Sequence, residues 1–110
     1  MPFKVLFLAH APDADPARHR GVIDTGMYRL FSVVVREQQE ALEVCRAFVR
    51  DERIDAVLLC PGFTHRDVAQ IAAAAGEEVG VFVARGDGPS NRVTLEARRR
   101  AGYHTARARD

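Results

Sequence analysis

Three side chains in this sequence are suited to catalysis by type and position: Cys60, His10 and His19. Cys60 ends the apolar run IDAVLLC, and a thiol beside a helix N-terminus and cationic groups is a nucleophile because its thiolate is favoured there. Imidazoles exchange protons near neutral pH, so His10 or His19 could serve as general acid or base. The alternative, which we favour for Cys60, is a packed thiol at a strand end, since free cysteine is among the most buried residue types.

An anion could bind just beyond this cysteine. Gly62 permits close approach of a ligand to the backbone, and Phe63 and Thr64 lie where the N–H groups of a first helical turn would point at it. Arg20 and Arg85 could hold a carboxylate or phosphate through two parallel hydrogen bonds. The alternatives are ordinary turn and capping chemistry for Gly62 and Thr64, and surface ion pairs for the arginines. The spacing matches neither a Walker loop nor a dinucleotide-binding glycine motif.

The sequence specifies no cofactor. A zinc site made of His10, Cys60 and His65 is conceivable, but these residues lack any recognised ligand spacing. The two cysteines, Cys45 and Cys60, form no C-x-x-C pair, which fits a reduced cytoplasm and gives no support to a disulfide framework. We therefore expect a cytoplasmic protein without a metal site.

Hydrophobic periodicity predicts an alternation of strands and helices. The run 54–60 is almost wholly apolar, as in a strand covered on both faces in a parallel sheet. Thr64, with Asp67 three residues later, forms a capping-box pattern that begins the next helix, and Gly76 suits its end. The predicted strands are 3–9, 28–35, 54–60 and 79–84, and the predicted helices are 36–53 and 64–75, with a short helix from Asp15 toward Ile23.

Strands and helices alternate from residue 28 to residue 84, which gives two consecutive βαβ units. Right-handed crossovers make such strands parallel, so we predict a small open, mainly parallel four-stranded α/β sheet flanked by helices, of flavodoxin or Rossmann type. The carboxyl ends of the strands would gather His10, Cys60 and Arg85 at one edge, and the His19-Arg20 segment leaves from that edge too. This shared edge is the predicted binding site.

The C-terminal part differs in composition from the rest. Residues 1–91 form the predicted α/β domain, and residues 92–110 form an arginine-rich extension that could be a short helix or an edge strand. For the helix, Ser90 or Asn91 could act as the cap. The arginines suit a solvated face or a subunit contact better than a nucleic acid, because aromatic residues do not alternate with them.

Length and charge narrow the classes of function. A chain of 110 residues with 47% hydrophobic residues forms one domain. Its net charge of +1 argues against a nucleic-acid partner, and no apolar run reaches the ~20 residues of a membrane span. A small sheet leaves edges and apolar surface that self-association can cover, so we expect a homo-oligomer.

Four short segments resemble a small bacterial family that is catalogued only as a domain of unknown function. They are APDADPARHR at 11–20, VIDT at 22–25, CPGF at 60–63 and VFVAR at 81–85. Two features depart from the family: glycine often stands where this chain has Pro61, and the segment RVTLEARRRAGYH continues differently. The resemblance implies a compact α/β protein and no activity. It also implies a shared pattern made of His19, Arg20, Cys60, Gly62, Phe63 and Arg85.

Three functions therefore stay open. The first, which we place ahead, is a module that binds a small anionic metabolite at the carboxyl edge of the sheet. The second is an enzyme that uses the Cys60 thiolate in thiol, sulfur or acyl transfer, with His10 or His19 as the base. The third is a structural or regulatory subunit of a homo-oligomer.

Overall fold

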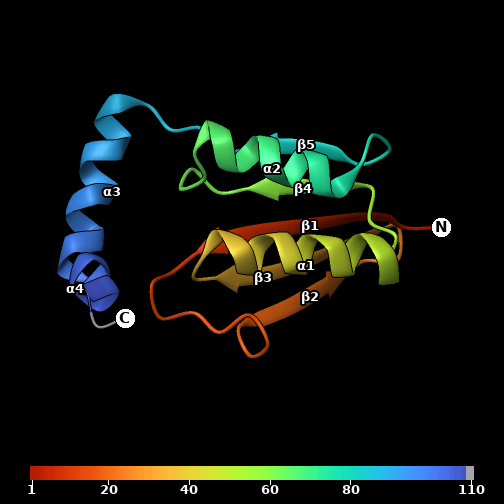
Figure 1. Cartoon of the computed structure of the whole chain (residues 1–110), viewed down its shortest axis with the longest axis horizontal. Helices are drawn as coiled ribbons and strands as arrows, with labels where there is room; N and C mark the ends of the chain where they lie inside the picture. The colour runs from red at the N-terminus through yellow and green to blue at the C-terminus, as the bar shows by residue number, and fades with distance from the viewer. Residues whose placement is uncertain (109–110) are drawn as a thin grey trace.

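A mostly parallel sheet of five strands forms the centre of the molecule (Figure 1). The structure is a computed structural model and describes residues 1–108. In space the strands follow the order β2-β3-β1-β4-β5; β2 runs antiparallel to β3, and the other neighbours are parallel. The α/β class is confirmed, with one strand more than the four predicted. The strands are β1 (Phe3–His10), β2 (Arg20–Asp24), β3 (Tyr28–Val35), β4 (Ala56–Leu59) and β5 (Gly80–Val83).

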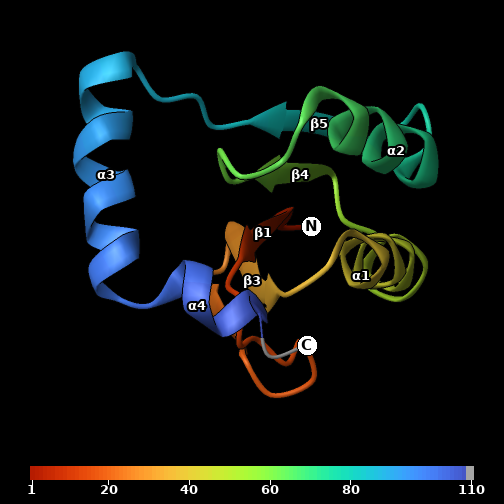
Figure 2. The same cartoon turned by 60° about the vertical axis from the view of Figure 1, so that its left-hand side comes forward.

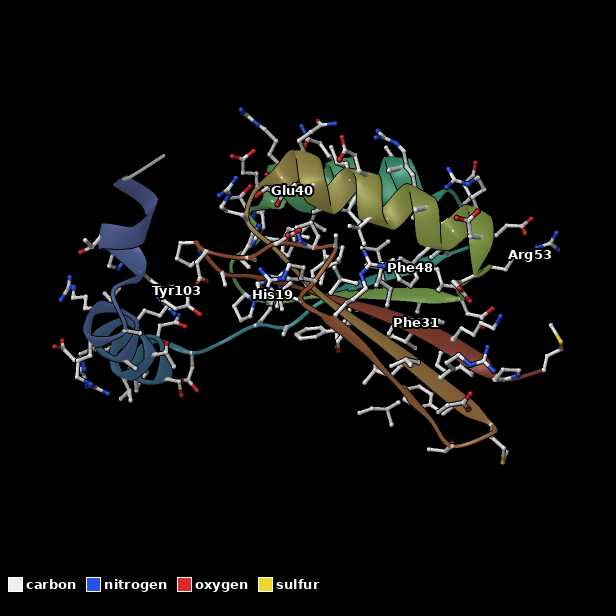
Figure 3. The ribbon with its side chains drawn as sticks, turned by 90° about the horizontal axis from the view of Figure 1, so that it is seen from below. His19, Phe31, Glu40, Phe48, Arg53 and Tyr103 are labelled. Atoms are coloured by element: carbon white, nitrogen blue, oxygen red, sulfur yellow. The ribbon has the colours of Figure 1, made fainter. Side chains whose placement is uncertain are left out.

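Helices α1 (Gln38–Asp51) and α2 (His65–Ala75) cover one face of this sheet (Figures 1 and 2). The chain passes from β3 through α1 to β4, and from β4 through α2 to β5, in the same direction across the sheet. Right-handed crossovers then place both helices on the same side. The core lies between these helices and the sheet, where the rings of Phe31 and Phe48 pack with centroids 5.0 Å apart (Figure 3).

Local signals set the ends of both helices. The Thr64 hydroxyl accepts the backbone N–H of Asp67, and the Asp67 carboxylate accepts the N–H of Thr64, so the predicted capping box is confirmed. Gly76 follows α2 with a φ of +89°, which favours glycine. The start of α1 has no Ser, Thr, Asp or Asn cap; instead the Glu40 carboxylate accepts the backbone N–H groups of residues 36 and 37.

The short helix predicted after Asp15 is wrong. Residues 15–19 form a turn, in which the N–H of Asp15 donates to His19 Nδ1 at 2.9 Å, and the following residues form β2. Val22 and Ile23 are β-branched and favour extended backbone. A hairpin turn with Gly26 at a φ of +100° then joins β2 to β3. The Asp-Pro helix-start signal depends only on neighbouring residues. The backbone hydrogen bonds that β2 forms with β3 stabilise the extended conformation more than this signal stabilises a helix.

Strand β2 also determines what covers the second face of the sheet. The connection from β1 to β3 runs opposite to the other two, so a helix within it would cover that face. Instead the chain returns within the sheet as β2, and none of the described helices covers the second face (Figure 3). The molecule therefore has two layers and one open face.

The C-terminal segment is helical, so the helix is confirmed and the edge strand is wrong. Helix α3 (Gly88–Arg100) begins after Asp87, whose carboxylate accepts the N–H of Ser90 at 2.8 Å; the cap is thus neither Ser90 nor Asn91. Helix α4 (Tyr103–Ala108) follows after Gly102. No residue of α3 is buried, and the helix stands beyond the carboxyl ends of the strands (Figure 1).

Candidate functional site

A cleft of about 1130 Å³ lies between the carboxyl edge of the sheet and the segment formed by α3 and α4. One side is formed by the residues that end or follow β1, β3 and β4, together with the first turns of α1 and α2. The other side is formed by the loop after β5, α3 and α4. The lining residues are His10, Ala11, Pro12, Arg36, Glu37, Gln38, Cys60, Pro61, Gly62, Asp67, Gly86, Ser90, Asn91, Thr94, Leu95, Arg98, Tyr103 and His104.

Three of the predicted site residues come together in this cleft: His10, Cys60 and Gly62. The Cys60 Sγ lies 4.0 Å from His10 Nδ1. A Cβ on Gly62 would lie 3.2 Å from His10 Nδ1 and 3.5 Å from Cys60 Sγ, so only a very small residue leaves this arrangement undisturbed. The ring of Phe63 packs against the imidazole with centroids 4.1 Å apart. Because β1 and β4 are paired neighbours, their ends hold the thiol and the imidazole side by side.

Burial controls the charge of His10. It lowers the pKa of this imidazole below the ordinary value of 6.5, because the imidazolium form loses hydration, while the Asp67 carboxylate partly opposes the shift. At neutral pH His10 is therefore uncharged. It can accept a proton from a neighbouring group, but it adds no positive charge to attract an anion.

One backbone donor at the start of α2, the N–H of Thr64, already has an acceptor. The Asp67 carboxylate takes the N–H of Thr64 at 3.0 Å, and it also supplies the negative charge that a helix N-terminus favours. In the anion cradle predicted at Gly62, Phe63 and Thr64, the N–H of Thr64 is therefore already paired within the chain.

Two arginines that were not predicted line the cleft: Arg36 and Arg98. Arg36 directly follows β3, and Arg98 belongs to α3, where its Nη1 donates to Thr94 Oγ1 at 3.4 Å. The rule that ligands gather at the carboxyl ends of parallel strands would have found Arg36. No sequence signal could have found Arg98, because its position depends on where α3 stands relative to the sheet.

The other predicted site residues lie outside the cleft. The Arg20 guanidinium lies 5.6 Å from the ring centroid of Phe48, and its Nε donates to the Pro16 carbonyl at 2.7 Å. Arg85 is exposed in the segment between β5 and α3, and Phe63 is buried behind His10. Not among the lining residues are His19, Arg20, Phe63, Thr64 and Arg85.

Residues 1–108 contain neither a group of metal ligands nor a membrane-spanning helix. In this part of the chain, no three His, Cys, Asp or Glu side chains are grouped as ligands for a metal ion. None of the helices described there combines the length and apolar character needed to cross a membrane.

Comparison with known protein families shows which family the chain belongs to. Residues 3–97 match a family of unknown function, DUF6506, and the chain therefore belongs to this family. The match extends from β1 into α3, so it includes one side of the cleft and part of the other, while Arg98, Tyr103 and His104 lie beyond it. Comparisons with curated proteins and with solved structures gave no match.

Proposed function

We propose that this chain binds a small anionic ligand, with a carboxylate or phosphate group, in the cleft at the carboxyl edge of the sheet. The observation that carries the proposal is that Arg36 and Arg98 line one cleft from two different elements. A guanidinium is a planar fork of N–H donors whose geometry matches a carboxylate or phosphate group. His104 also lines the cleft and adds a further donor.

The position of the cleft supports this proposal. In open parallel sheets of the flavodoxin and Rossmann types, ligands bind where the strand order reverses. Here the connection from β1 leads across the sheet to β3, and the connection from β3 leads back in the opposite direction to β4. The strand order therefore reverses between the neighbouring strands β1 and β4. Their ends carry His10 and Cys60, which would contact the uncharged part of the ligand. The cleft volume of about 1130 Å³ lies slightly above the about 300–1,000 Å³ of typical ligand pockets, so the cleft has room for a metabolite.

Replacing Arg98 by glutamine tests the proposal. We expect the affinity for an anion to fall on the order of 10- to 100-fold, because the variant loses a charge-assisted hydrogen bond to the ligand. Isothermal titration calorimetry with inorganic phosphate, pyrophosphate and citrate would measure the change. Arg92→Gln is the matched control, because Arg92 is exposed on the same helix and does not line the cleft. Equal weakening in both variants, or no binding of any of the three anions to the wild-type chain, would contradict the proposal.

A second candidate function is favoured by one distance, the 4.0 Å between Cys60 Sγ and His10 Nδ1. The uncharged imidazole could take the thiol proton, and the thiolate could then attack an acyl carbon. His10 would return that proton to the leaving group, which leaves an acyl group on Cys60. This chemistry uses the same cleft and requires a reactive thiol.

Alkylation rates distinguish this candidate from simple binding. If Cys60 is a nucleophile, iodoacetamide at pH 7 should modify it several-fold faster than free cysteine, and His10→Asn should remove the advantage. Peptide mass spectrometry can follow both cysteines in one sample. Cys45 is the internal control, because it is fully buried and burial raises the pKa of its thiol. If Cys60 were alkylated no faster than free cysteine, the nucleophilic function would be excluded and simple binding would be the remaining candidate.

A further inference from the structure

The second face of the sheet is apolar and open. The strand residues that alternate with the core positions point to this side, and none of them is charged in any of the five strands. Several large side chains stand exposed there: Phe3 is 52% exposed, Ile23 63% and Phe82 62%. The ring of Phe3 packs beside that of Tyr28 on the adjacent strand, with centroids 5.9 Å apart.

The apolar side chains of this face leave a patch of surface exposed to solvent. The three exposed rings of Phe3, Tyr28 and Phe82 leave on the order of 300 Å² in contact with solvent, because an aromatic side chain presents about 150–250 Å². Ile23 and the half-buried Phe7 and Leu30 add to it. Contiguous apolar patches above a few hundred Å² mark interaction sites.

We infer that a second copy of this chain covers the open face, sheet against sheet, about a two-fold axis. Pairing the face with itself buries on the order of 1,000 Å² in total, which is what a specific interface needs. An isologous contact brings the same residues of both copies together. Because none of the strand residues that point to this face is charged, pairing the two sheets places no like charges of the strands opposite each other. Two sheets packed in this way lie about 10 Å apart with their side chains interdigitated.

The position of α3 fits the same arrangement. Figures 2 and 3 show α3 on the side of the open face, away from α1 and α2. In the single chain none of its residues is buried, and Val93 is 67% exposed. A copy seated on the sheet would lie beside this helix and cover part of its surface. The same contact would close one side of the cleft against solvent.

Replacing Phe82 by lysine tests the inference. Light scattering after size exclusion should give the wild-type chain a mass of about 24 kDa, twice the 12.2 kDa of one chain. In Phe82→Lys the dissociation constant of the dimer should rise on the order of 100-fold or more, because two charges would be buried without partners. Phe82 is 62% exposed in the single chain, so circular dichroism should show an unchanged fold.

The matched control is Val22→Lys. Val22 is 57% exposed on the edge strand β2, and its register partner is the core residue Phe31, so it points away from the open face. This variant should remain a dimer. Ile23→Lys, on the open face of the same strand, should dissociate, and it replaces Phe82→Lys if that variant fails to fold. A monomeric wild-type chain, a dimer that survives both open-face variants, or dissociation by Val22→Lys would overturn the inference. None of these readouts depends on ligand binding.

Discussion

Replacing Leu59 by alanine should lower the free energy of unfolding by about 2–5 kcal/mol, the range for a fully buried leucine that leaves a cavity. Leu59 has no exposed surface and lies on β4, opposite Leu8 of β1, in the part of the sheet that α1 and α2 cover. The flanking strands are fixed by hydrogen bonds, so they cannot close in on the space that the side chain leaves. Urea denaturation followed by circular dichroism would measure the loss.

The control for this prediction is Val22→Ala. Val22 is 57% exposed on β2, so removing its methyl groups should change the free energy of unfolding by no more than about 0.5 kcal/mol. Both variants must be compared at the same protein concentration, because self-association adds to the apparent stability. Similar losses in the two variants would show that the core is not where the sheet and the two helices place it.

Replacing Gly62 by valine should weaken ligand binding in the cleft. The new Cβ would lie 3.2 Å from His10 Nδ1 and 3.5 Å from Cys60 Sγ, and the two methyl groups would need the space between them. Overfilling of this kind costs about 1–3 kcal/mol, which either displaces the imidazole or reduces the stability of the chain. We expect the affinity for the anions to fall, and titration calorimetry would measure the loss.

Gly62→Ala provides the graded comparison. Its single methyl group meets the far end of the His10 side chain, which can move by a few tenths of an ångström, so binding should weaken less than with valine. Thermal unfolding of both variants separates a loss of binding from a loss of fold. If Gly62→Val bound anions as the wild-type chain does, the ligand would not contact the group formed by His10, Cys60 and Gly62.

Local sequence features determined most of the secondary structure. The apolar run before Cys60 predicted a buried strand, and the pair Thr64 and Asp67 predicted where α2 begins; both predictions are confirmed. These signals act over a few residues, within a turn of helix or a short strand. The same locality explains the error at β2, where the start signal at Asp15 could not be weighed against pairing with a distant strand.

The sequence by itself determined the α/β class, the two helices on the sheet, and the meeting of His10 with Cys60, because paired parallel strands bring their carboxyl ends together. Only the tertiary structure decided that Arg20 lies over the ring of Phe48, that the Asp67 carboxylate accepts the N–H of Thr64, and that Arg98 lines the cleft. It also decided that one face of the sheet stays open. Each of these depends on how segments far apart in the chain pack together, and no local pattern of residues encodes that.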